Sequence, residues 1–132
     1  MALRLAIVED VATMKTIWTR FLAGSGHDFR FFDSNRGRVD EMQAYRPDVI
    51  FSPAVTHFCP VSMLIEEIKS RQQFNDTAFV LSTSLDSQAI RGNLDIKCEY
   101  MLLTKPFTPK HLEALLVSLE TRRSSGAKER RP

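Results

Sequence analysis

Short apolar runs alternate with segments of helical spacing along most of this 132-residue chain. A short apolar run suits a strand that is buried on both faces of a sheet, whereas apolar residues at i, i+3 and i+4 mark one face of a helix. The runs predict strands at 3–8, 29–32, 48–52, 78–81 and 102–104. The helical pattern predicts helices between Asp10 and Gly24, at 35–45, at 61–71, irregularly at 86–94, and after Thr108.

The predicted helices carry apolar stripes and end signals. Asp10 is a candidate N-cap for the first helix, and Thr108 followed by Pro109 is a typical start for the last. Side chains expected to point inward are Met14, Ile17, Trp18, Phe21 and Leu22 in the first helix, Val39, Met42 and Tyr45 in the second, Leu64, Ile65 and Ile68 in the third, and Leu112, Leu115, Leu116 and Leu119 in the last.

Five strands alternating with five helices predict an α/β fold, a doubly wound five-stranded parallel sheet with helices on both faces. In such folds the loops at the carboxyl ends of the strands build the functional crevice. Five positions fall at those ends, and together we call them the strand-end cluster: Glu9, Asp10, Pro53, Ser82 and Lys105.

Composition and charge narrow the class of protein to which this chain can belong. The length suits one domain, expected at 1–120, followed by a basic and disordered tail at 121–132. That tail carries a net charge of +4 and the whole chain +2, so residues 1–120 carry −2. Nucleic-acid binding is therefore not expected of the domain. Without a membrane-spanning run, a signal-peptide pattern or paired cysteine motifs, we expect a cytoplasmic protein.

The strand-end residues resemble the receiver domain of bacterial response regulators over roughly residues 3–120. Four segments carry the likeness, in order and at suitable spacing: Leu5 to Asp10, Pro47 to Ser52, Leu81 to Thr83, and Thr104 to Phe107. The resemblance implies a flavodoxin-like, CheY-like sheet of order 2-1-3-4-5.

The resemblance also assigns chemistry to the cluster. It implies that Glu9 and Asp10 correspond to magnesium-binding acids, Pro53 to the phosphorylated aspartate, Ser82 to a switch hydroxyl and Lys105 to the lysine that pairs with the phosphoryl group. Proline offers neither a nucleophile nor a ligand, so phosphorylation at this position is excluded. We expect no cofactor beyond a weak magnesium site at Asp10, and a structural use of Asp10 as helix cap and ion-pair partner of Lys105.

Further positions depart from the receiver pattern. The switch position on the fifth strand, aromatic in the family, is Leu102, and Tyr100 two residues earlier is a poor substitute. The loop after the third strand has His57 and Val61 where the family carries proline and glycine. His57 and Cys59 are too few for a transition-metal site, which needs about four ligands. Ser52 is expected to face away from the cluster, and the third strand to stop near it.

These observations favour a non-enzymatic signalling module that binds proteins and is not phosphorylated on aspartate. Expected partners are a histidine kinase, a cyclase or an output domain, within the same natural chain or separate, and a second copy through the face of the fourth helix, fifth strand and fifth helix. The alternatives are a receiver with a nonstandard phosphoacceptor, and a flavodoxin-like domain that binds a metal or a small molecule, because fold alone does not fix function.

Overall fold

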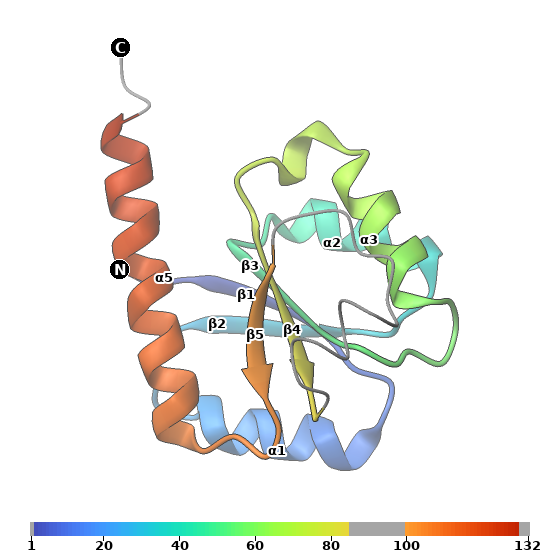
Figure 1. Cartoon of the computed structure of the whole chain (residues 1–132), viewed down its shortest axis with the longest axis horizontal. Coiled ribbons are helices and arrows are strands. Elements are labelled where there is room, and N and C mark those ends of the chain that lie inside the picture. The colour runs from blue at the N-terminus through green and yellow to red at the C-terminus, as the bar shows by residue number, and fades with distance from the viewer. Residues whose placement is uncertain (1, 85–99, 130–132) are drawn as a thin grey trace.

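The computed structural model describes residues 2–84 and 100–129, the side chains of 123–129 excepted (Figure 1). Its strands are β1 (Arg4–Val8), β2 (Asp28–Phe32), β3 (Val49–Pro53), β4 (Ala78–Thr83) and β5 (Met101–Thr104). Its helices are α1 (Ala12–Leu22), α2 (Val39–Tyr45), α3 (Val61–Lys69) and α5 (Pro109–Glu129), with short 3-10 turns at Arg36–Arg38 and Gln72–Phe74. The fourth helix predicted at 86–94 lies outside the described residues.

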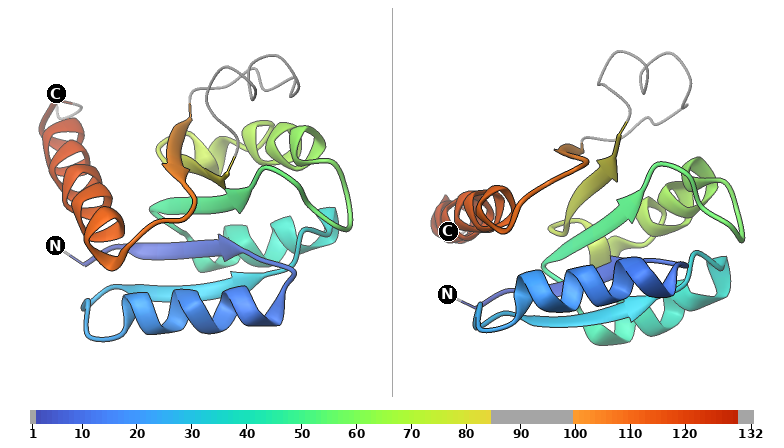
Figure 2. Two further views of the ribbon diagram at one scale, coloured as in Figure 1. Left: turned by 60° about the horizontal axis from the view of Figure 1, so that its bottom comes forward. Right: turned by 90° about the horizontal axis from the view of Figure 1, so that it is seen from below.

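The five strands form one parallel sheet in the order β2-β1-β3-β4-β5, which confirms the predicted fold class and strand order. Helices α2 and α3 cover one face, and α1 and α5 cover the other (Figure 2). Because all strands run in one direction, their carboxyl ends meet at a single edge of the sheet.

Each face of the sheet has its own apolar core. On the α2–α3 side, Val39, Met42 and Tyr45 pack inward as predicted, together with the α3 stripe. On the α1–α5 side, Trp18 lies against Phe51, with ring centroids 5.0 Å apart. Full burial of such aromatic and aliphatic side chains is the main stabilising contribution to a fold of this size.

The α1 stripe is narrower than predicted. Trp18 and Leu22 are buried and Phe21 packs against them, but Ile17 is 38% exposed. Among its apolar side chains, α1 fully buries only Trp18 and Leu22 against this face of the sheet, and Ile17 lies at the margin of the contact. In α5 the predicted stripe is confirmed: Leu112, Leu116 and Leu119 are buried, and Leu115 is partly so.

One prediction about a helix end is wrong and one is confirmed. The N-cap of α1 is Val11, without any side-chain cap, because the Asp10 carboxylate is turned elsewhere. At α5, the Thr108 Oγ does accept a hydrogen bond from the His111 backbone N–H at 3.2 Å. Helix α5 continues to Glu129, past the expected end of the domain at residue 120.

None of the helices in the described ranges combines the length and the apolar character needed to cross a bilayer.

Candidate functional site

Side-chain alternation brings the strand ends together on one face of the sheet. Four residues of the α1–α5 core lie one on each of β1, β3, β4 and β5: Ile7, Phe51, Val80 and Leu103. Side chains two residues further along a strand point the same way. The same side therefore receives four members of the strand-end cluster: Glu9, Pro53, Ser82 and Lys105.

Pro53 occupies the carboxyl end of β3. It lies in register with Ser82 of β4, so β3 runs one residue further than predicted, although its pairing with β1 ends at Phe51. Ser52, adjacent to Pro53, alternates to the α2–α3 side, and its hydroxyl donates to the Pro53 carbonyl oxygen at 3.0 Å. No carboxylate therefore stands at the end of the central strand.

Asp10 takes a different position from its neighbours and makes the densest set of hydrogen bonds in the cluster. Its Oδ1 accepts from the Ser34 backbone N–H at 2.8 Å, and its Oδ2 accepts from the Ser34 hydroxyl at 2.7 Å and from the His57 backbone N–H at 3.0 Å. Burial alone would raise the pKa of Asp10, but the bonds from His57 and Ser34 outweigh it and lower that pKa. The ionised carboxylate thus ties β1 to the segment after β2 and to the loop after β3.

The expected ion pair between Asp10 and Lys105 is absent. Within the described part of the chain, Lys105 has no carboxylate at ion-pair distance, although its backbone N–H donates to the Thr83 carbonyl at 2.8 Å. The physical reason is that Asp10 is engaged by donors on the opposite side, toward β2. The Lys105–Pro106 peptide bond is cis.

Ser82 and Glu9 are both buried in the cluster, with 3% and 4% of their surface exposed. The Ser82 hydroxyl has no hydrogen-bond partner among the described residues. Glu9 accepts a hydrogen bond from the Val11 N–H through Oε2 at 3.3 Å. A buried hydroxyl without a hydrogen-bond partner costs free energy, so the Ser82 hydroxyl is expected to destabilise the fold.

The residues present do not fit a magnesium site. Magnesium requires oxygen ligands in near-octahedral geometry. Both oxygens of Asp10, the best remaining ligand, already accept hydrogen bonds from protein donors, and Pro53 supplies no side-chain oxygen. In the described ranges, no three His, Cys, Asp or Glu side chains gather as a metal site needs.

Sequence reasoning missed Ser34, which is fully buried and central to the site. Besides its two bonds to Asp10, its hydroxyl accepts from the Phe58 N–H at 3.0 Å and its carbonyl accepts from the Cys59 thiol at 3.1 Å. Burial raises the pKa of Cys59, so this thiol stays protonated and serves as a donor. A usable signal existed, because Ser34 follows β2 and the predicted strand order places that end beside β1.

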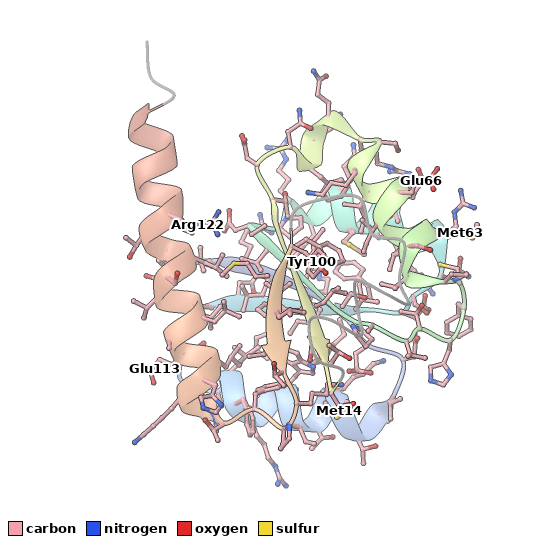
Figure 3. All side chains as sticks on the ribbon, viewed as in Figure 1. Met14, Met63, Glu66, Tyr100, Glu113 and Arg122 are labelled. Carbon is pink, nitrogen blue, oxygen red and sulfur yellow. The ribbon has the colours of Figure 1, made fainter. Side chains whose placement is uncertain are left out.

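Leu102, the switch position, pairs with Leu81 of β4 and is half-buried against the α2–α3 core. Tyr100, the residue before β5, packs against the same core (Figure 3). The aromatic ring therefore lies on the predicted face but two residues early. Ser82 lies on the other side of the sheet, so β5 presents no ring to its hydroxyl.

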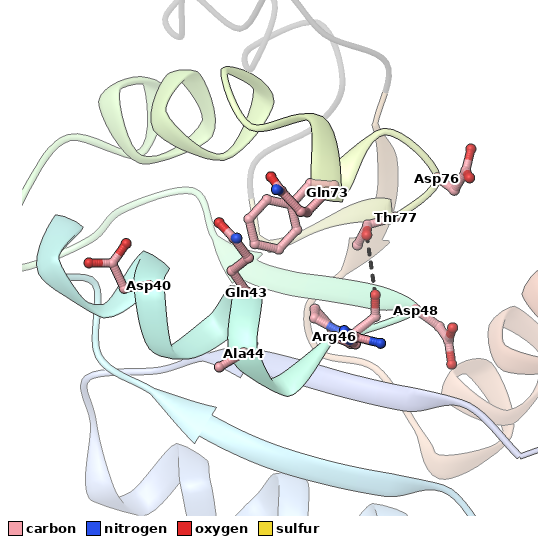
Figure 4. A pocket seen from close by; sticks show the side chains of 10 residues that line it. Asp40, Gln43, Ala44, Arg46, Asp48, Gln73, Asp76 and Thr77 are labelled. Atoms are coloured by element: carbon pink, nitrogen blue, oxygen red, sulfur yellow. Dashed lines mark hydrogen bonds between the residues drawn. The ribbon is translucent and has the colours of Figure 1, made fainter.

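A separate cavity of about 740 Å³ lies at the opposite, amino end of the sheet (Figure 4). It is lined mainly by polar residues of α2, of the turn after it and of the segment before β4, including Asp40, Arg46 and Asp76. On its wall the buried Thr77 hydroxyl donates to the Pro47 carbonyl at 3.2 Å. None of the strand-end cluster contributes to it.

The chain is similar in structure to solved receiver domains. The chemotaxis response regulator CheY4 of Vibrio cholerae matches with a TM-score of 0.75 at 18% identity, over 90% of this chain and 99% of that one. The signal receiver domain of a LuxO repressor protein from Vibrio parahaemolyticus matches with a TM-score of 0.81 at 16% identity, over 100% of both chains.

A third similar structure is the receiver domain of the sensor histidine kinase PA1611 from Pseudomonas aeruginosa, solved with magnesium in its active-site cleft. It matches with a TM-score of 0.75 at 19% identity, over 88% of this chain and 95% of that one. No protein-family model and no curated protein sequence matches this chain. The comparisons establish a CheY-like receiver fold.

Proposed function

We propose that this chain is a cytoplasmic receiver-like signalling module that acts by binding other proteins and is not phosphorylated on aspartate. The observation that carries the proposal is Pro53 at the carboxyl end of β3, in register with Ser82. Phosphoryl transfer to a receiver needs a nucleophilic oxygen at that position, and proline has none.

The neighbouring hydroxyls do not replace the missing nucleophile. Ser52 alternates to the other face, and its hydroxyl is committed to the Pro53 carbonyl. Ser82 is buried, and no base accepts a hydrogen bond from its hydroxyl among the described residues. An alcohol attacks a phosphorus centre efficiently only when a base takes its proton.

The Asp10 contacts support the same proposal. In a phosphorylatable receiver this carboxylate would be needed for a metal ion, whereas here it binds three protein donors. An acid tied into the fold in this way is a structural element. The strand-end cluster therefore favours one stable arrangement of its loops rather than a metal-dependent change between two.

The partner class follows from the kind of protein in which similar folds occur. The similar structures include a chemotaxis response regulator and a domain of a sensor histidine kinase. We propose a histidine kinase, a cyclase or an output domain as the partner of this chain, in the same polypeptide or a separate one. Function resides in surfaces and sites rather than in the fold, so the surface of the module carries its specificity.

The test is incubation of the full chain with a small acyl-phosphate donor and Mg²⁺, followed by intact-mass measurement. We expect no phosphoryl adduct. A receiver domain with an intact aspartate, treated in parallel, shows that the donor is active. An acid-stable or hydroxylamine-sensitive adduct on the native chain would overturn the proposal.

A Pro53→Asp variant makes the experiment sharper. Restoring the carboxylate supplies a nucleophile but leaves Asp10 bound to Ser34 and His57, so we expect little or no phosphorylation from this change alone. Efficient phosphorylation of the variant would show that the Asp10 contacts yield readily to a metal ion. It would leave the prediction for the native chain unchanged.

A further inference from the structure

His27, in the turn between α1 and β2, contacts two other parts of the chain. Its Nδ1 atom accepts a hydrogen bond from the Leu3 backbone N–H at 2.9 Å. Its Nε2 atom lies 3.2 Å from Oε1 of Glu120 on α5, and the imidazole is only 9% exposed. We call these two contacts the His27 clasp. Through the clasp, one side chain joins the start of β1 to the last helix.

The His27 clasp lies where α5 passes the starts of β1 and β2. Figures 1 and 2 show both strands beginning beside α5, partway along the helix. Leu3 is fully buried and belongs to the same apolar core as Leu119, the neighbour of Glu120 in α5. The clasp therefore holds α5 next to the last leucine of its buried stripe.

The contacts of His27 determine which of its nitrogen atoms carries the proton. A backbone N–H can only donate, so Nδ1 must accept through its lone pair. A neutral imidazole has one N–H group, which is then on Nε2, within hydrogen-bond distance of the Glu120 carboxylate. The His27 clasp is therefore complete only with a neutral imidazole in the Nε2–H form.

An imidazolium does not fit the clasp, because both of its nitrogen atoms carry hydrogen. The Nδ1–H would face the Leu3 N–H, and two donors repel each other. Leu3 is fully buried, so its N–H would bear the desolvation cost of a donor without an acceptor. The charge of Glu120 favours the imidazolium, but Glu120 is 27% exposed, and an ion pair with a solvated partner contributes little. Protonation of His27 is thus expected to open the clasp.

Other charged side chains of the surrounding elements are directed elsewhere. Asp28, the next residue, accepts its hydrogen bond on the α2–α3 side of the sheet. Arg122, two residues beyond Glu120 on α5, donates to a methionine sulfur of β5. Arg20, in the last turn of α1, is exposed to solvent. Within the described part of the chain, Glu120 is therefore the charged group in contact with the imidazole.

We propose that the His27 clasp is a pH-sensitive device, which holds α5 to the start of β1 while His27 is neutral and opens when His27 takes up a proton. Histidine side chains usually change charge between about pH 5 and pH 8. The pKa of Asp10 lies below its ordinary value of 3.8, so Asp10 stays ionised across this interval. The proposal does not depend on the proposed function, because the phosphorylation experiment and the one below can each fail alone.

The test is NMR spectroscopy of the full chain between about pH 8 and about pH 5. The imidazole carbon signals report the charge of His27, and hydrogen exchange reports the protection of the Leu3 amide and of the α5 amides around Glu120. We expect the Leu3 protection factor, corrected for the intrinsic exchange rate, to fall at least about tenfold as His27 becomes charged. The α5 amides should lose protection at the same midpoint.

Two variants separate His27 from the other histidines. In His27→Asn the carboxamide oxygen can accept from the Leu3 N–H as Nδ1 does, but the side chain does not titrate, so we expect Leu3 protection to stay constant with pH. The matched control is His111→Asn at the start of α5, where Nδ1 accepts from the Thr108 N–H at 3.3 Å. This control should respond to pH like the native chain. Thermal unfolding at about pH 8 verifies that both variants fold.

Three results would overturn the proposal. One is a Leu3 amide that keeps its protection in the native chain while the His27 imidazole is charged. Another is an imidazole that stays neutral over the whole interval. The third is an equal loss of Leu3 protection in the native chain and in His27→Asn, which would place the pH response in a different group. The first two results come from the native chain alone and do not require that His27→Asn folds.

Discussion

At the amino end of the sheet the polar side chains of neighbouring elements pair with one another, whereas at the carboxyl end Ser82 and Lys105 lack such a partner among the described residues. The Tyr45 hydroxyl donates to Asp28 at 2.7 Å, and Asp48 accepts from the Arg4 N–H at 2.8 Å. His27 joins Glu120 of α5 at 3.2 Å. These contacts close the amino end by linking β1, β2, α2 and α5.

The carboxyl end is held mainly through one residue. Asp10 collects three hydrogen bonds, while the buried Ser82 hydroxyl has no partner in the described part of the chain and Lys105 has no carboxylate beside it. The lesson is that stability at this end depends on a single carboxylate, whereas at the other end it is divided among several modest contacts. Four predictions test this difference.

The largest expected effect is that of Asp10→Ala. The substitution removes the acceptor of three hydrogen bonds and leaves the buried Ser34 groups unpaired, so we expect the free energy of unfolding to fall by about 2–4 kcal/mol. Urea denaturation followed by Trp18 fluorescence measures it. The control is Asp33→Ala, which removes an exposed ion pair with Arg38 and an exposed hydrogen bond from the Asn35 N–H, and we expect it to cost less than Asp10→Ala. Equal losses in the two variants would contradict a special role of Asp10.

The fold was predictable from the sequence because its signals are local and repeated. Strand runs, the leucine stripe of α5 and the Thr108 cap each follow from nearest-neighbour geometry, and all agree with one topology. Two local predictions were wrong. Asp10 does not cap α1 because a tertiary partner, Ser34, takes its carboxylate. Ile17 is exposed because the width of a helix face depends on what covers it.

The candidate site was predictable in its membership but not in its bonding. Strand order and alternation are enough to bring Pro53, Ser82 and Lys105 to one edge and one face. The direction in which Asp10 turns depends on backbone N–H groups of Ser34 and His57, and every residue type except proline carries such a donor. The side-chain pattern therefore holds no sign of these bonds, and the predicted pair with Lys105 failed for that reason.

The second prediction concerns the amino end, where Tyr45→Phe removes one of several contacts. We expect a loss of about 1 kcal/mol at neutral pH, because the Asp28 carboxylate is solvated and does not become a buried orphan. Burial, followed by Asp28, raises the pKa of Tyr45 to about 12 from its ordinary 10.0. The protonated phenol therefore stabilises the fold fully below pH 10, and this contribution is lost as the pH rises toward 12.

An absorbance titration measures this directly, because Tyr100 is the other tyrosine in the chain. In the native protein the Tyr45 phenol should ionise near pH 12, about two units above the ordinary tyrosine value. In Tyr45→Phe this ionisation step should be missing. An unchanged titration curve in the variant would mean that Tyr45 is not the shielded phenol.

The third prediction concerns the contribution of the Asp10 carboxylate to stability at acid pH. The folded-state pKa of Asp10 lies below its ordinary value of 3.8, so the ionised carboxylate contributes stability that is present above that value and is lost as the pH falls through the lowered pKa. We expect a smaller effect than that of Asp10→Ala, because a protonated carboxyl keeps its shape and one acceptor oxygen. Urea denaturation of native protein and Asp10→Asn between pH 2 and pH 6 measures it. If the free energy of unfolding fell equally with pH in both proteins, Asp10 would not be the source of the acid dependence.

The smallest expected effect comes from two buried hydroxyls at opposite ends of β4. Thr77, just before the strand, donates to the Pro47 carbonyl, whereas Ser82, near its carboxyl end, has no partner in the described residues. Thr77→Val should cost about 1 kcal/mol, because it keeps the shape and leaves a buried carbonyl unpaired. Ser82→Ala should leave the free energy of unfolding unchanged or raise it by up to about 1 kcal/mol, since a buried hydroxyl without a partner is already a cost. If Ser82→Ala were as destabilising as Thr77→Val, the Ser82 hydroxyl would have a bonding partner, and the contrast between the two ends would rest on Asp10 and Lys105 alone.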